Sequence, residues 1–318
     1  MYNFFNRNRF FQSLLLFPLF GGIIYFLLVY PVTFDFEWSP FIPLFFPANP
    51  TAQLPLKILA ITILFATLIL GRLFFRKYGF FDTPSYYAPV FYISILLLSG
   101  IYEKSFSPLF FIFILVIILF INTDYNLPDI KGKIFISGIL VGIISFANVT
   151  AVLLLFFLIG SLMVHRFAKM KDICVAFFGL LLPIIYFLSY YFLTDQLGRV
   201  MEAYSHLSFF GFTKSLVTLS AFQLIKLILL ILILFYFMIW LRLQYASKLI
   251  VLRRCLVSID IMTIVLLAML FFSNSSYMEM QLYMAVPLTT YFSLVTREQR
   301  KWIFHNVLII TTFLLLWL

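Results

Sequence analysis

The apolar residues of this chain fall in long runs, and the length of these runs constrains the fold more than any other feature of the sequence. Many of them approach the roughly 20 residues that an α-helix needs to cross the hydrocarbon core of a bilayer. Of the 318 residues, 64% are apolar and only 11% are charged, whereas soluble domains have about 45–50% apolar and about 25% charged residues. The sequence therefore predicts an all-α, polytopic transmembrane helical bundle and excludes a soluble globular domain.

The apolar runs predict about eleven transmembrane spans in a single membrane domain over residues 1–318. The predicted spans are residues 10–30, 55–75, 85–102, 106–122, 133–146, 148–164, 173–193, 221–241, 257–272, 281–296 and 302–318. The first span is expected to be an uncleaved helix, because its apolar run is longer than that of a signal peptide. The run 133–164 is too long for one helix and is interrupted only around Asn148. We interpret this run as a tight helical hairpin.

The distribution of Lys and Arg predicts the orientation of the bundle. Basic residues near the ends of membrane helices collect on the cytoplasmic side. With the N-terminus in the cytoplasm, all but five of the 22 Lys and Arg fall on that side, provided that 133–164 crosses twice. The five predicted on the outside are Lys57, Lys104, Arg199, Lys214 and Lys226. The C-terminus is then expected outside.

Two predicted outer loops, at residues 31–54 and 194–220, are longer than simple turns. The first is rich in proline, contains Asp35 and Glu37, and has no Lys or Arg. A carboxylate placed there can act as a general base if it reaches a substrate hydroxyl and if its pKa suits the task. The alternative is that these acidic side chains only solvate the loop, and the residues alone leave both interpretations open.

The second outer loop contains Arg199 and Lys214, together with Tyr204 and His206. The planar fork of an arginine binds a phosphate through two hydrogen bonds, so Arg199 is the best phosphate-binding candidate. The loop has a helical apolar pattern, which is also typical of an amphipathic helix that lies in the membrane interface. For Lys57 and Lys226, about one turn inside their helices, we favour snorkelling to the head groups.

Asp260 lies about one turn into the ninth predicted span, and an ionisable side chain at membrane depth is a functional candidate by default. Because it is near the cytoplasmic end of the span, close in sequence to Arg253 and Arg254, we expect an ion pair there rather than a proton relay. The Gly138-x-x-x-Gly142 pattern permits close helix packing and is expected to act locally within the hairpin.

Several classes of function are excluded by what the sequence contains. The three histidines are far apart and the two cysteines offer no paired framework, so no metal site and no disulfide are predicted. The chain has none of the glycine-rich phosphate-binding motifs or HExxH. We therefore expect no cofactor and no nucleic-acid partner, and the expected partner common to all interpretations is the lipid bilayer.

From the first to the seventh predicted span, the order of the pieces resembles the membrane module of the GT-C class of glycosyltransferases. The resemblance covers about residues 10–215, and four additional helices are predicted in about 216–318. The pieces that carry it are the acidic first outer loop, the basic turn Gly71–Gly79, the short outer turn Gly100–Pro108, the glycine-containing hairpin Lys131–Arg166, and a seventh helix with Pro183 that leads to the Asp195–Lys214 segment. The chain also resembles small, phenylalanine-rich inner-membrane proteins of Gram-negative bacteria, which implies no activity.

The GT-C resemblance implies a multi-pass inner-membrane enzyme that transfers a sugar from a polyprenyl-phosphate-linked donor to an acceptor at the outer face. It implies Asp35 as the base with Glu37 as the alternative, Arg199 and Lys214 as the donor-phosphate site, and Tyr204 and His206 on the acceptor side. The competing hypothesis is a non-enzymatic accessory subunit of a membrane protein complex. A transporter is less favoured, because the sequence has few charges at membrane depth and no clear internal repeat.

Overall fold

The computed structural model describes residues 21, 53–77, 91–95, 106–123, 130–165, 169–195, 197–198, 221–245, 250–272, 283–297, 307–312 and 314. This part of the chain is almost entirely helical and contains no strand. Its main helices are α4 (Gln53–Lys77), α6 (Phe106–Asn122), α7 (Ile130–Ala147), the 3₁₀ helix η4 (Val149–Leu153), α8 (Leu154–Val164), α9 (Met170–Leu193), α12 (Ala221–Tyr245), α13 (Ile250–Phe272) and α15 (Ala285–Arg297). The prediction of an all-α fold is confirmed for these residues.

Three stretches of the described helices are long and apolar enough to cross a membrane: Lys57–Lys77 in α4, Met170–Leu193, and Leu224–Gln244 in α12. At about 1.5 Å per residue, 20 residues cover roughly the 30 Å of a hydrocarbon core. These helices fit a helical membrane protein. The count of about eleven spans and the sides on which the two termini lie stay predictions.

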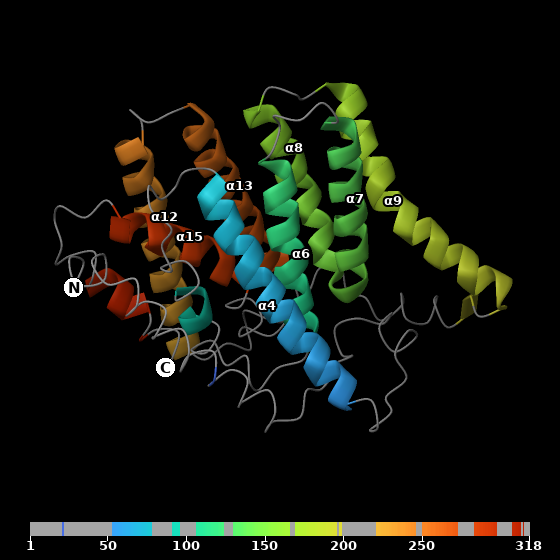
Figure 1. The fold of residues 1–318 in the computed structure, drawn as a ribbon, viewed down its shortest axis with the longest axis horizontal. Helices are drawn as coiled ribbons and strands as arrows, with labels where there is room; N and C mark the ends of the chain where they lie inside the picture. Colours follow the sequence, from blue (N-terminus) through green and yellow to red (C-terminus); the bar gives the residue numbers. More distant parts are fainter. Residues whose placement is uncertain are drawn as a thin grey trace.

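The described helices share one apolar core. Its largest fully buried side chains come from helices far apart in the sequence: Phe111 from α6, Phe157 from α8, Phe237 from α12, and Tyr291 and Phe292 from α15. Phe292 makes edge-to-face contacts with Phe237, at a ring-centroid distance of 5.5 Å, and with Phe91, at 5.8 Å. The short helix α15 therefore lies inside the bundle and not on its surface (Figure 1).

The helix break predicted around Asn148 is present. The side-chain oxygen of Asn148 accepts hydrogen bonds from the backbone nitrogen of Thr150, at 3.1 Å, and from the Thr150 hydroxyl, at 2.7 Å. An asparagine in this position satisfies backbone donors that a new helix leaves unpaired, so it ends α7 and starts η4. The interpretation of 133–164 as two helices rather than one is thereby confirmed.

Helices α7 and α9 pack more closely than an ordinary helix pair, through a seam formed by Gly138, Gly142 and Gly179, which we call the glycine seam. A Cβ atom on Gly138 would overlap the carbonyl oxygen of Ala176, and one on Gly142 would lie 2.6 Å from that of Leu180. The glycine pattern was expected to act within the hairpin, and its partner is instead the next helix, α9. Only glycine permits this approach of two backbones.

The register of the seam gives the direction of the chain. Gly138 faces Ala176 and Gly142 faces Leu180, so residue numbers rise together and the two helices are parallel. The chain between them must therefore run back, and η4 with α8 makes this return (Figure 1). The start of α7 and the start of α9 thus lie at the same end of the bundle.

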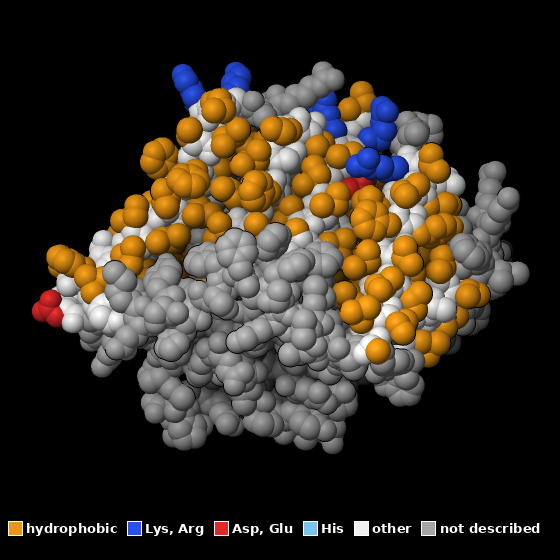
Figure 2. All heavy atoms as spheres, turned by 180° about the vertical axis from the view of Figure 1, so that it is seen from behind, with side chains coloured by type: hydrophobic (Ala, Val, Ile, Leu, Met, Phe, Trp, Pro, Cys, Tyr) orange, Lys and Arg blue, Asp and Glu red, His pale blue; other side chains and the backbone are white. Residues whose placement is uncertain are grey.

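Other contacts place further helix ends at this same end. Lys77, the last residue of α4, lies over the Phe120 ring near the end of α6, and Asn122, the last residue of α6, donates a hydrogen bond to Ser137 in the first half of α7. The short connection 246–249 brings the end of α12 beside the start of α13. We call this the basic end, because Figure 2 shows Lys and Arg gathered there, while hydrophobic side chains cover most of the described surface on the face in view. The start of α4, the end of α9 and the start of α12 lie at the opposite end (Figure 1).

Candidate functional site

The six residues predicted for the outer-face site lie outside the described residues: Asp35, Glu37, Arg199, Lys214, Tyr204 and His206. What the structure does place is the helix ends from which both predicted outer loops leave. Helix α4 begins at Gln53, at the end of the 31–54 segment, and α9 ends at Leu193, directly before the 194–220 segment. Both attachment points lie at the end opposite to the basic end (Figure 1).

A buried carboxylate joins the three helices α12, α13 and α15. Asp260 of α13 is 2% exposed. One of its oxygens, Oδ2, accepts a hydrogen bond from Arg242 Nε of α12 at 2.7 Å, and Oδ1 accepts one from the Tyr291 hydroxyl of α15 at 2.9 Å. The Thr263 hydroxyl lies 3.0 Å from that of Tyr291. We call these four residues the Asp260 cluster.

The ion pair expected at Asp260 is present, but its partner was predicted wrongly. Arg253 and Arg254 are on the same helix as Asp260, six and seven residues earlier, which is roughly 10 Å along a helix axis. The partner is Arg242, which reaches Asp260 from the neighbouring helix while its side chain stays 53% exposed. A buried charge is tolerated when it is paired and hydrogen-bonded, and both oxygens of Asp260 meet this condition.

A second group of polar side chains joins α13 to three further helices, α6, α7 and α8, near the basic end. The Ser258 hydroxyl of α13 lies 3.4 Å from His165 Nε2 and 3.4 Å from the Ser161 hydroxyl of α8. Next to it, the side-chain amide of Asn122 in α6 donates to the Ser137 hydroxyl of α7 at 3.1 Å. The two 3.4 Å contacts are longer than a strong hydrogen bond between such groups. This serine network therefore connects α6, α7, α8 and α13 through weak polar contacts.

His165, which directly follows α8, is neutral at physiological pH. Burial, together with the smaller effect of the positive charge of Arg254, lowers the pKa of its imidazole from 6.5 to about 4. A neutral imidazole fits this buried position beside the Arg254 charge, because both burial and a nearby positive charge disfavour the protonated form.

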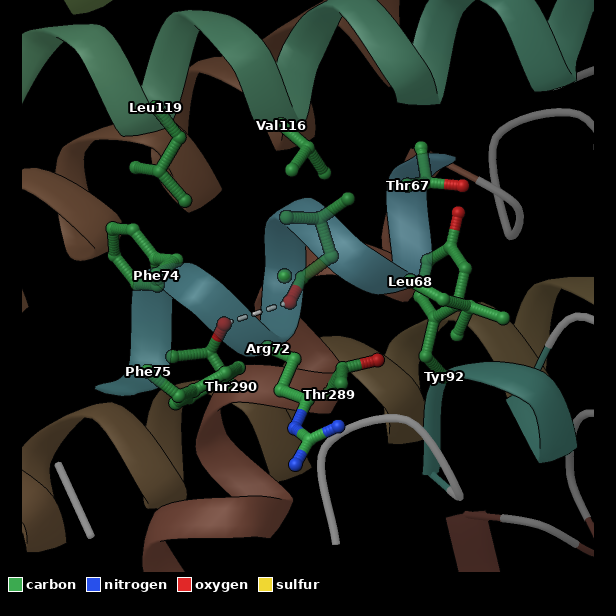
Figure 3. A pocket seen from close by; sticks show the side chains of 12 residues that line it. Thr67, Leu68, Arg72, Phe74, Phe75, Tyr92, Val116, Leu119, Thr289 and Thr290 are labelled. Atoms are coloured by element: carbon green, nitrogen blue, oxygen red, sulfur yellow. Dashed lines mark hydrogen bonds between the residues drawn. The ribbon is translucent and has the colours of Figure 1, made fainter. Parts of the chain in front are cut away.

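A small pocket opens between α4, the helical segment 91–95, α6 and α15 (Figure 3). Its walls are mostly apolar, and its volume is about 40 Å³, which exceeds the roughly 10–15 Å³ that one water molecule needs and is too small for a whole sugar. Among its polar lining side chains, Arg72 and Tyr92 differ from the threonines. Arg72 is exposed, and the hydroxyl of Tyr92 is buried without a hydrogen-bond partner in the described part of the chain.

The described residues contain no group of three or more His, Cys, Asp or Glu that could bind a metal ion. No family model, curated protein or solved structure matches the chain. The assignment of function therefore depends on the residues and on the geometry of the helices.

Sequence reasoning identified Asp260 but not the residues that surround it. An acidic residue inside an apolar run is visible without a structure. Arg242 and Tyr291 are 18 and 31 residues away and reach Asp260 from other helices. No spacing rule connects such positions, and the same holds for the pairing of Arg72 with Tyr92 in one pocket.

Proposed function

We propose that the protein is a multi-pass inner-membrane enzyme, similar to the GT-C glycosyltransferases, that uses a polyprenyl-phosphate-linked sugar donor at the outer face. The observation that carries the proposal is the position of two helix ends. The segments with Asp35 and Arg199 attach to α4 and α9 at one end of the bundle, opposite to the basic end. A base and a phosphate-binding residue must share one side of the membrane to act on one donor.

The proposed chemistry assigns each residue one task. Asp35, or Glu37 in its place, takes the proton of the acceptor hydroxyl as its oxygen attacks the anomeric carbon of the sugar. The bond between this carbon and the phosphate oxygen breaks, and the polyprenyl phosphate leaves with the bonding electrons. Arg199, with Lys214, neutralises the negative charge that collects on the departing phosphate. Tyr204 and His206 line the acceptor side.

The first prediction tests the base. We expect Asp35→Asn to lower sugar transfer from a polyprenyl-phosphate donor by at least about 100-fold, because loss of a general base typically costs 10²–10⁴. The measurement is transfer of radiolabelled sugar by the purified full-length protein, and Glu103→Gln, in a different predicted outer turn, is the matched control. Full activity in both Asp35→Asn and Glu37→Gln would refute the assignment.

The second candidate function is the accessory subunit, and the surface of α9 favours it. This helix exposes large apolar side chains along much of its length, among them Phe178, Ile185, Tyr186 and Phe192. Such a surface fits a neighbouring membrane helix as well as it fits lipid. Native mass spectrometry of the mildly purified protein separates the two candidates: a stoichiometric partner with no bound polyprenyl carrier supports the subunit, and a carrier that is lost in Arg199→Ala supports the enzyme.

A further inference from the structure

Helix α9 has two halves that are held to the bundle in different ways. The first half, up to Pro183, packs against α7 through the glycine seam, where a Cβ atom on Gly179 would lie 2.5 Å from the carbonyl oxygen of Phe135. Residues 184–193 form the second half, which we call the arm, and the arm leans away from α7 (Figure 1). The first half is therefore fixed backbone against backbone, and the arm is not.

The arm buries a stripe with two aromatic side chains, Phe187 and Tyr191. The ring of Phe187 lies 4.9 Å from that of Phe146, at the end of α7, and 4.7 Å from that of Tyr191. Most of the other large side chains of the arm are exposed, namely Ile185, Tyr186, Leu188, Tyr190, Phe192 and Leu193. In a membrane these side chains meet lipid tails in whichever direction the arm points, so a movement of the arm exchanges one apolar contact for another.

Pro183 lies at the boundary between the two halves of α9. Proline has no N–H group, so the helical hydrogen bond to the carbonyl oxygen of Gly179 is missing, and the proline ring keeps this carbonyl at a distance. The same ring packs against the last glycine of the seam, because a Cβ atom on Gly142 would lie 3.0 Å from Pro183 Cγ. The tightly packed part of α9 thus ends at the residue where the helix bends most easily.

We propose that α9 is hinged at Pro183 and that the contact between Phe146 and Phe187 is the latch of a movable arm. The arm is roughly 15 Å long, so a further bend of about 20° moves its end by roughly 5 Å. The segment 194–220, which contains Arg199, continues directly from this end. Movement of the arm therefore shifts the attachment point of this segment and admits the long tail of a polyprenyl donor from the side. This role rests on the proposed function, and the hinge itself does not.

Pulsed electron paramagnetic resonance on the purified full-length protein in lipid nanodiscs measures the hinge. One spin label replaces Leu193, at the exposed end of the arm, and the other replaces Phe156, an exposed residue of α8. Labels at Phe156 and at Phe177, in the first half of α9, are the matched control pair. The exposed Cys174 is replaced by serine so that it takes no label. We expect the distance distribution of the first pair to be broader than that of the control pair by about 5 Å.

Two substitutions test the parts of the hinge separately. Pro183→Ala restores the missing N–H group and should narrow the distribution between Phe156 and Leu193 to the width of the control pair. Phe146→Ala removes the latch and should shift this distribution, whereas Phe178→Ala, exposed in the first half of α9, should leave it unchanged. The control pair shows in each variant that the bundle is still folded. Equal widths for the two label pairs would overturn the proposal, and so would an unchanged width in Pro183→Ala.

Addition of a polyprenyl phosphate to the labelled protein tests the role of the arm. A ligand shifts a conformational equilibrium only if it binds one state more tightly than the other. We expect the probe to draw the distribution between Phe156 and Leu193 towards a single distance, and to have no such effect in Arg199→Ala. A broad distribution that does not respond to the probe would contradict the role in donor binding, while the hinge is measured without any enzymatic activity.

Discussion

At the scale of single residues, Asp260 is defined by its two hydrogen-bond donors. Arg242 and Tyr291 occupy both carboxylate oxygens, and neither comes from the helix that carries Asp260. A carboxylate whose lone pairs are engaged in this way is a poor base, and it joins three helices at one point. The Asp260 cluster is therefore a structural anchor.

Removal of the charged partner of Asp260, Arg242, should destabilise the fold more than removal of the neutral hydroxyl of Tyr291. We expect Arg242→Met to lower the free energy of unfolding by up to about 3 kcal/mol, because Asp260 keeps a buried charge without its cation. For Tyr291→Phe we expect about 1 kcal/mol, the size typical of polar contacts within membranes. Denaturant or thermal unfolding in detergent measures both changes. Arg253→Met, exposed on the same helix as Asp260, is the control, and a loss as large as that of Arg242→Met would contradict the anchor.

The lowered pKa of His165 predicts how the stability of the fold depends on pH. Its pKa is about 4 in the folded protein and 6.5 when unfolded, so the unfolded chain binds more protons between these values. Stability is then complete above about pH 6.5 and decreases as the pH falls towards 4. We expect His165→Gln to show a smaller decrease in melting temperature between pH 7.5 and pH 4.5 than the unaltered protein. The same decrease in both proteins would show that His165 is not the group responsible.

At the scale of helices, the glycine seam fixes the distance between α7 and α9. Gly138 and Gly179 face each other with a Cβ-to-Cα distance of 3.1 Å for the Cβ that an alanine would add. The sequence predicted that this glycine pattern permits close packing. It did not identify the partner, because a GxxxG pattern describes one surface and contains no information about the helix that covers it.

Glycine-to-alanine substitutions should lower the stability of the fold inside the glycine seam and raise it outside the seam. Gly138→Ala places a methyl group against the Ala176 backbone, which cannot move aside as a flexible side chain can. We expect a loss of about 2 kcal/mol or more. Gly71→Ala meets nothing within 4 Å and should stabilise α4 by about 0.5–1 kcal/mol, because alanine favours a helix more than glycine does. Melting temperatures of the two variants test the contrast, and equal shifts would count against the seam.

At the scale of the whole molecule, the sequence predicted the helical class and the break at Asn148 well. Both follow from local rules: the length of an apolar run and the ability of asparagine to cap a helix. The arrangement of helices around α15 was not predictable in this way. Thr289 and Thr290 line the pocket beside α4, while the neighbouring Tyr291 reaches Asp260. These contacts depend on how helices distant in the sequence assemble, and the spacing of the residues in the sequence does not predict them.

The parallel pairing of α7 and α9 also delays the packing of α7 during synthesis of the chain. Membrane helices are synthesised in order, and α8 must be made and must turn back before α9 can reach its place. The end of α9 is roughly 50 residues beyond Gly142, which at about 5–20 residues per second is a delay of roughly 3–10 seconds. For these seconds after its synthesis, the glycine face of α7 has not yet received the backbone of α9 that covers it in the folded protein.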